Sequence, residues 1–170
     1  MVRLEPLLES LKTVRQHTAQ AVDDMPAGEL DFQPAPGVMT FRQIARHILD
    51  ASQALCGMML AGIEDFSASD FRDRLKSFMS TLPEDAPAGD LAAELRRSAE
   101  RYTAELGTRP AEFFAHVITR FDGQKTTRME LVQMVKEHEM THRAQMFLYL
   151  RLKGIVPSTT RLRQSKQAAR

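Results

Sequence analysis

The sequence has one cysteine, no tryptophan and only two tyrosines in 170 residues. The single cysteine, Cys56, excludes an internal disulfide and fits a reducing compartment, so we expect a cytoplasmic protein. No apolar run approaches membrane-spanning length, and the segment 1–6 leads into an amphipathic pattern rather than the apolar core of a signal peptide. We therefore expect no membrane association.

A strong excess of charge of one sign is also lacking, since the formal net charge is only +1. Basic residues without acidic neighbours gather at the end of the chain: Arg161, Arg163, Lys166 and Arg170. Without this segment the chain is slightly acidic, the opposite of what nucleic-acid binding requires, so nucleic acid is not an expected partner. We expect a single domain over residues 1–157 and a basic, flexible C-terminal tail over residues 158–170.

The residues that are abundant favour helices. Leu, Ala, Met, Glu and Arg are frequent, apolar residues recur at spacings of three and four, and clear strand patterns are hard to find. A chain of 170 residues forms one domain with a sizeable core. The sequence therefore predicts an all-α helical bundle.

Capping and breaking residues predict where the helices begin and end. Thr40 with Gln43, and Thr127 with Glu130, are typical of capping boxes, and Asp90 is the predicted cap of a further helix. Gly154 ends the last long helix. The predicted helices are 4–25, 41–61, a short one at 71–79, 90–106 and 127–153, with long connections between them.

Three histidines on two of these helices are the candidate metal ligands. His138 and His142 are one helical turn apart and lie on one side of their helix. His47 shares the apolar side of its own helix with Ile44 and Ile48. Three imidazoles directed into a bundle core indicate a metal site of zinc or nickel, and the alternative is a set of hydrogen-bonded core histidines.

The segment from His138 to His142 also matches the H-E-x-x-H pattern of metalloproteases. In those enzymes the glutamate is the general base and the third ligand usually follows downstream. No His, Asp, Glu or Cys follows His142, so a third ligand must come from upstream. His47 is preferred because Cys56 lies on the opposite side of the same helix.

Two other histidines are less suitable ligands. His17 falls outside the apolar stripe of the first helix and is expected at the surface. His116 lies in a segment without a clear helical pattern, next to an Asp122-Gly123 turn, and is kept as a reserve ligand or a substrate contact.

Several side chains near the histidines are candidates for further roles. Glu139 is either a general base or, as we prefer, a surface residue paired with Arg143 one turn later. Gln145 and Tyr149 are candidates for hydrogen bonds to a ligand histidine or to substrate. Met129, Met140 and Phe147 lie on the opposite side of the helix, where other helices or a dimer partner would cover them.

Two segments of the chain resemble the DinB-like (YfiT-like) family of helical bundle proteins. The first is Thr40-Phe41-Arg42-Gln43-Ile44-Ala45-Arg46-His47-Ile48. The second is His138-Glu139-Met140-Thr141-His142-Arg143-Ala144-Gln145, followed by Leu150, Gly154 and Pro157. The resemblance implies a four-helix bundle with long inter-helix connections, commonly a homodimer. It also implies one divalent metal ion, often nickel or zinc, with ligands that match His47, His138 and His142.

The resemblance narrows the expected activity to a few classes. Family members include thiol S-transferases that use low-molecular-weight bacterial thiols, thiol-dependent isomerases and proteins labelled metal-dependent hydrolases. We expect a metal-dependent enzyme of thiol S-transferase type that joins a low-molecular-weight thiol to small electrophiles. The alternatives are a metal-dependent hydrolase and a non-catalytic metal-binding stress-response protein.

Overall fold

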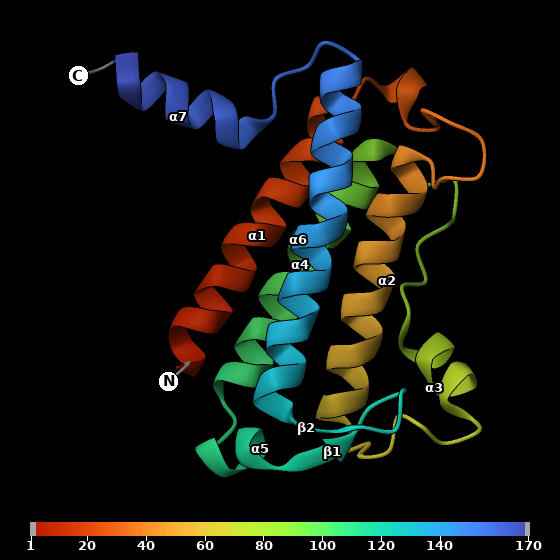
Figure 1. The fold of residues 1–170 in the computed structure, drawn as a ribbon, viewed down its shortest axis with the longest axis vertical. Coiled ribbons are helices and arrows are strands. Elements are labelled where there is room, and N and C mark those ends of the chain that lie inside the picture. Colours follow the sequence, from red (N-terminus) through yellow and green to blue (C-terminus); the bar gives the residue numbers. More distant parts are fainter. Residues whose placement is uncertain (1–2, 169–170) are drawn as a thin grey trace.

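Four long helices form the body of the protein in the computed structural model, which describes residues 3–168 (Figure 1). They are α1 (Leu4–Asp24), α2 (Phe41–Leu60), α4 (Ala88–Gly107) and α6 (Arg128–Leu152). α1 and α6 run in one direction, and α2 and α4 run in the other. The predicted all-α four-helix bundle is confirmed. No helix within residues 3–168 combines the length and the apolarity needed to cross a membrane.

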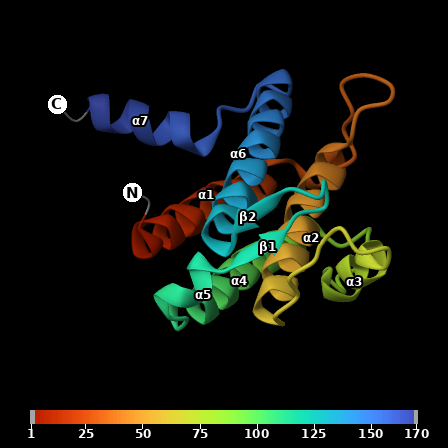
Figure 2. The same cartoon turned by 60° about the horizontal axis from the view of Figure 1, so that its bottom comes forward.

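Shorter elements fill the long connections between these helices. They are η1 (Ala27–Glu29), α3 (Phe71–Phe78), α5 (Ala111–Ala115), β1 (Val117–Thr119) and β2 (Lys125–Thr127). α3 packs beside α2 outside the bundle, while α5 and the hairpin lie across one end of it (Figure 2). β1 and β2 are antiparallel, with Ile118 opposite Thr126. Gly123 in the turn between them has a φ of +79°, which glycine adopts without strain.

Both predicted capping boxes are present. The Thr40 hydroxyl accepts a hydrogen bond from the Gln43 amide while the Gln43 side chain accepts from the Thr40 amide, and Thr127 and Glu130 repeat the arrangement. The predicted cap at Asp90 is wrong, because α4 already begins at Ala88 after Pro87. Asp90 lies instead in the first turn, where a carboxylate is favoured by the helix dipole.

The basic segment at the end of the chain, for which the sequence predicts a flexible tail, contains a helix. Residues Ser158–Ala168 form α7, which projects away from the bundle (Figure 1). The Pro157 carbonyl accepts the first hydrogen bonds of this helix, and its Arg, Gln, Lys and Ala residues are good helix formers. Arg161 joins it to α1 through Asp24, with contacts of 2.8 and 2.9 Å to the two carboxylate oxygens. Arg170 lies outside the described residues.

The core consists of two apolar clusters separated by a polar layer. One cluster is centred on residues such as Phe41, Ile44 and Leu95, and the other on residues such as Met58 and Leu106. In the sequence of each long helix, buried polar residues lie between the members of the two clusters, and they include Arg15, Ser52, Ser98 and Glu139. Burial of a polar group is costly unless it is hydrogen-bonded, so this layer requires internal partners.

Candidate metal centre

The structure brings His47, His138 and His142 together. Their candidate ligand atoms all lie within 4.8 Å of one another, and the Nε2 atoms of His47 and His138 are 3.0 Å apart. The ring centroids are 4.5 to 4.8 Å apart. Two nitrogens bound to one tetrahedral zinc ion at the usual Zn–N length lie about 3.3 Å apart. The His47–His138 separation is close to this value, and the three imidazoles are near enough to one another to be candidate ligands of a single divalent ion.

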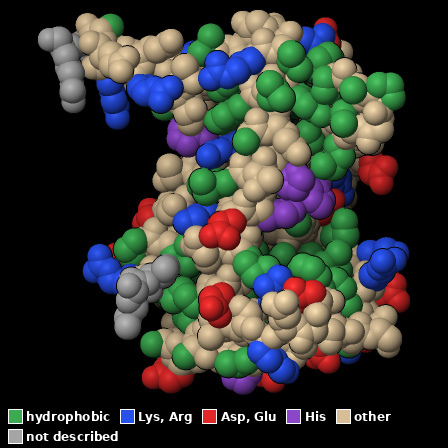
Figure 3. All heavy atoms as spheres, viewed as in Figure 1, with side chains coloured by type: hydrophobic (Ala, Val, Ile, Leu, Met, Phe, Trp, Pro, Cys, Tyr) green, Lys and Arg blue, Asp and Glu red, His purple; other side chains and the backbone are tan. Residues whose placement is uncertain are grey.

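The trio lies at the edge of the bundle, not in its core as the sequence suggested. His47 is exposed, and His138 and His142 are partly buried. Histidine side chains gather on the surface beside α2 and α6 in Figure 3. The interior positions are taken by Ile44 and Ile48 on α2, so His47 is turned toward the border between the helices. Because the site opens to solvent, coordination positions remain for water or substrate.

The surroundings keep two of these histidines neutral. Partial burial and the neighbouring imidazoles of His47 and His142 lower the pKa of His138 to about 4. Burial, followed by the effect of His142, also lowers the pKa of His47. Neutral imidazole is the form that binds metals, so the trio is prepared for a cation at neutral pH.

Gln145 orients one of the histidines. Its Oε1 atom lies 2.9 Å from Nδ1 of His142. A glutamine oxygen only accepts hydrogen bonds, so the contact favours the His142 tautomer that carries its proton on Nδ1 and leaves Nε2 free as a ligand. A hydrogen bond between Gln145 and a ligand histidine is one of the roles expected from the sequence.

Tyr149 and His116 are engaged elsewhere. The buried Tyr149 hydroxyl donates to the Met39 carbonyl at 2.9 Å and links α6 to the loop before α2. His116 follows α5, and its Nε2 atom lies 2.8 Å from the Glu64 carboxylate. The structure does not bring His116 into the group of potential ligands formed by the trio.

Glu139 is neither a surface residue nor a partner of Arg143. Its side chain is 1% exposed, and its two oxygens lie 2.9 and 3.0 Å from the Nε atom of Arg15. The Thr18 hydroxyl lies 2.6 Å from one of them. Arg143 instead donates to the Val14 carbonyl and lies over the Phe147 ring. The predicted surface pairing is wrong, and the carboxylate is already bonded within the bundle rather than free to serve as a base.

Arg15 is a buried charged residue for which the sequence predicts no role. It is 1% exposed, and its guanidinium donates to Ser52 and Ser98 as well as to Glu139. The signal was available, because Arg15 lies four residues after Leu11 on the apolar stripe of α1. A charged residue on such a stripe indicates a buried partner of opposite charge.

A hollow of about 350 Å³ adjoins His47. Its lining comes from α2 and from the loop that follows α3: Arg42, Gln43, Arg46, His47, Asp50, Met79 and Glu84. Arg46 holds that loop in place by donating to the Ser80, Leu82 and Pro83 carbonyls while pairing with Asp50. A hollow of this size suits a small molecule.

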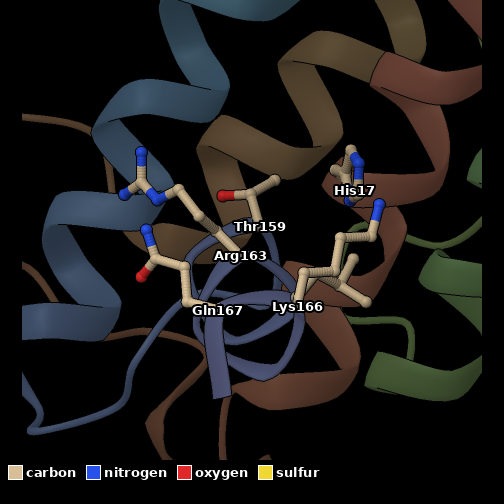
Figure 4. A pocket seen from close by; sticks show the side chains of 6 residues that line it. His17, Thr159, Arg163, Lys166 and Gln167 are labelled. Atoms are coloured by element: carbon tan, nitrogen blue, oxygen red, sulfur yellow. The ribbon is translucent and has the colours of Figure 1, made fainter. Parts of the chain in front are cut away.

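A second hollow, of about 430 Å³, lies between α1 and α7 (Figure 4). His17, Arg163 and Lys166 line it, with no carboxylate among the lining residues. His17 is partly buried there, and this burial, followed by the charge of Arg143, lowers its pKa. His17 is not part of the trio, and it is partly buried where the sequence predicts a surface position.

Comparisons with solved structures show where this fold recurs. YfiT from Bacillus subtilis, described as a probable metal-dependent hydrolase with an unusual four-helix bundle topology, has a TM-score of 0.71 and 21% identity; 91% of each chain is covered. A DinB-like protein from the same organism has a TM-score of 0.67 and 21% identity, over 88% of this chain and 92% of that one. A mycothiol-dependent maleylpyruvate isomerase has a TM-score of 0.64 and 14% identity, over 85% of this chain but 61% of that one. At these identities the likeness concerns the fold alone.

The family assignment rests on the sequence as well. No significant match is found among curated proteins. The sequence profile of the DinB superfamily, however, matches residues 10–146, which include α2 and most of α6 with all three histidines. With the profile covering most of its length and its bundle shared with DinB-like structures, this chain belongs to the DinB superfamily.

Proposed function

We propose that this protein is a metal-dependent enzyme in which His47, His138 and His142 hold one divalent ion, nickel or zinc. The observation that carries the proposal is the convergence of three imidazoles at a solvent-accessible edge of the bundle. Three protein ligands with open positions are typical of catalytic rather than structural sites. A divalent ion held there supplies a Lewis acid that lowers the pKa of a thiol or water that it coordinates.

The residues of the chain have separate tasks in this proposal. The neutral imidazoles of His47 and His138 provide lone pairs, and Gln145 holds His142 in the ligand tautomer. The hollow beside His47, with its wall held by Arg46, receives the small-molecule substrate. Glu139 is assigned no catalytic role because its carboxylate is bonded to Arg15.

The reaction we favour is transfer of a low-molecular-weight thiol to a small electrophile. An open site next to a hollow leaves room for two reactants, and the similar isomerase fold belongs to a mycothiol-dependent protein. Metal-dependent hydrolysis is the second candidate, supported by the likeness to YfiT over 91% of each chain. A metal-binding stress-response protein without turnover is the third.

Assembly and location complete the proposal. Met140 is exposed on the side of α6 away from the histidines, and Leu148 and Leu152 are exposed further along the same helix. Exposed apolar side chains of this kind support a homodimer. Met129 and Phe147, the other residues predicted on this side, are only partly buried and pack against the two core clusters. The single buried cysteine supports a cytoplasmic location.

The first test is elemental analysis of the full chain, purified without a histidine tag or added metal. We expect about one equivalent of nickel or zinc per chain in the wild type and its loss in His142→Ala. His17→Ala is the matched control, because it removes a partly buried histidine outside the trio. A wild-type protein that contains no metal and does not bind added nickel or zinc would contradict the proposed function.

The reaction class is tested next with the metal-loaded wild type. Consumption of a thiol together with an electrophile, lost in His142→Ala, supports thiol transfer. Product formed from an ester or amide without thiol supports hydrolysis. If neither occurs with a metal-loaded protein, the non-catalytic alternative is favoured.

A further inference from the structure

The buried polar layer joins the two helices that carry the metal ligands to the rest of the bundle. The Arg15 guanidinium donates at 2.9 and 3.0 Å to Glu139 on α6 and at 2.7 Å to the Ser52 hydroxyl on α2. On α4 it donates to the Ser98 hydroxyl at 3.0 Å and to the Leu95 carbonyl at 3.2 Å. One side chain from α1 therefore contacts all three other long helices.

The position of Glu139 fixes the rotation of α6. Glu139 follows His138 directly and precedes His142 by three residues, so at about 100° per residue both histidines lie on the same side of it, His138 roughly 100° and His142 roughly 60° away. When the Glu139 carboxylate points to Arg15 inside the bundle, both imidazoles are turned toward α2. A rotation of α6 that separated the histidines from His47 would break the buried ion pair, which leaves an uncompensated charge in the core.

Ser52 provides the corresponding constraint on α2. It lies five residues after His47, and its buried hydroxyl accepts from Arg15 while donating to the Leu49 carbonyl at 2.9 Å. The same guanidinium thus holds both ligand-bearing helices. The geometry of the metal site and the geometry of the polar layer are coupled through Arg15.

We propose that Arg15 and Glu139 are positioning residues for the metal centre. The Arg15 guanidinium fixes α2 and α6 relative to each other and so holds the three histidines close together before a metal binds. This inference rests on the proposed function, because it assumes that the trio binds metal. It assigns to Glu139 of the H-E-x-x-H segment an orienting task in place of the general-base task known from metalloproteases. The chemistry is hydrogen bonding alone, and no metal contact by Arg15 or Glu139 is involved.

Two serines offer a matched test. Ser52 and Ser98 are both buried, each accepts a hydrogen bond from Arg15, and each donates to the carbonyl three residues earlier. They differ in that α2 carries a ligand histidine and α4 carries none. Ser52→Ala and Ser98→Ala should therefore lower the urea midpoint by comparable amounts, while only Ser52→Ala weakens Zn²⁺ binding, by about tenfold.

The measurements are Zn²⁺ affinity by chelator competition, the urea midpoint, and the visible absorption bands of the Co²⁺-loaded protein. We expect Ser52→Ala to shift the Co²⁺ bands and Ser98→Ala to leave them as in the wild type. Equal Zn²⁺ affinity in the two variants would overturn the inference, whether both match the wild type or both fall. If the wild type itself binds no Zn²⁺, the proposed function fails, and that outcome is separate from the serine comparison.

A double variant, Arg15→Met with Glu139→Leu, provides a second test that does not depend on the serines. Apolar residues of similar volume often replace a buried ion pair without loss of stability. We expect this variant to fold but to bind Zn²⁺ at least about tenfold more weakly, because the directional bonds to α2 and α6 are gone. A folded double variant with wild-type affinity and an unchanged Co²⁺ spectrum would show that the ion pair has no positioning role.

Discussion

Gln145 Oε1 lies 2.9 Å from His142 Nδ1, three residues away on α6. This contact selects a tautomer of His142. Loss of a hydrogen-bond partner of a ligand histidine typically weakens metal binding by about 10- to 100-fold. We therefore expect Gln145→Leu to weaken Zn²⁺ binding by about tenfold or more without a large loss of stability. Chelator competition measures the affinity.

Gln133→Leu is the control for this prediction. Gln133 lies on the same helix and donates to Glu137 at 2.7 Å, without contact to the trio. Its replacement should leave Zn²⁺ affinity unchanged. Equal affinities in Gln145→Leu, Gln133→Leu and the wild type would show that the Gln145 contact does not orient a ligand.

The stability of the metal-free protein should depend on pH through His138. Its pKa is lowered from 6.5 to about 4, so between these values the unfolded chain binds a proton that the folded chain does not. The free energy of unfolding therefore falls as the pH decreases from about 6.5 toward 4. Above about pH 6.5 His138 is neutral in both the folded and the unfolded chain, so this loss of stability is absent. Urea denaturation near pH 7.5 and near pH 5 measures the difference, which should be smaller in His138→Gln. An identical pH dependence in the variant would contradict the prediction.

Cys56 should be chemically inert in the folded protein. It is 3% exposed, and burial raises its pKa to about 12, so the reactive thiolate is scarce at neutral pH. An aromatic disulfide reagent at about pH 8 should release no thiolate from the native protein and about one equivalent after denaturation in urea. Rapid labelling of the native chain would show that the α2 face carrying Cys56 opens readily.

Arg46 should hold in place the loop after α3, which lines the hollow beside His47. Removal of its side chain leaves the Ser80 and Leu82 carbonyls without their donor, and we expect Arg46→Ala to lower the free energy of unfolding by about 1–3 kcal/mol. Amide hydrogen exchange should accelerate in residues 79–86 and stay slow in the middle of α2 and α6.

Arg74→Ala is the control for the loop. Arg74 pairs with Asp70 at the same four-residue spacing as Arg46 with Asp50. Both Arg74 and Asp70 are half-exposed, and a surface pair of this kind contributes less than about 1 kcal/mol to the free energy of unfolding. Exchange in residues 79–86 should be unaffected by this change. Faster exchange in both variants, or in neither, would indicate that Arg46 does not hold the loop.

Local patterns were sufficient to predict the four long helices and to select His47, His138 and His142 as candidate ligands, while metal binding by these histidines stays a prediction. The capping boxes at Thr40 and Thr127 depend on residues three positions apart, so they are readable without tertiary information. The approach of His47 to the α6 histidines followed from the side of each helix on which they lie. The hairpin was not predicted, because each strand has only three residues and Val117 is exposed.

The interior face of α6 was misplaced for a specific reason. Its buried arc includes two charged residues, Arg128 and Glu139, which an apolar pattern does not count. The predicted core side was therefore rotated toward His138 and His142, which are only partly buried. A buried ion pair between helices becomes visible only when both partners are placed in space, since Arg15 and Glu139 are 124 residues apart.

The three clustered histidines come from distant parts of the chain, since His47 and His138 are 91 positions apart. An ion bound to both would act as a reversible cross-link that closes this long loop, and the unfolded chain would have to release it. At a free metal concentration about 100 times the dissociation constant, such a link adds roughly 2.7 kcal/mol to the free energy of unfolding. Heat resistance would then follow the supply of metal, and separation of α2 from α6 would set the rate at which the ion escapes.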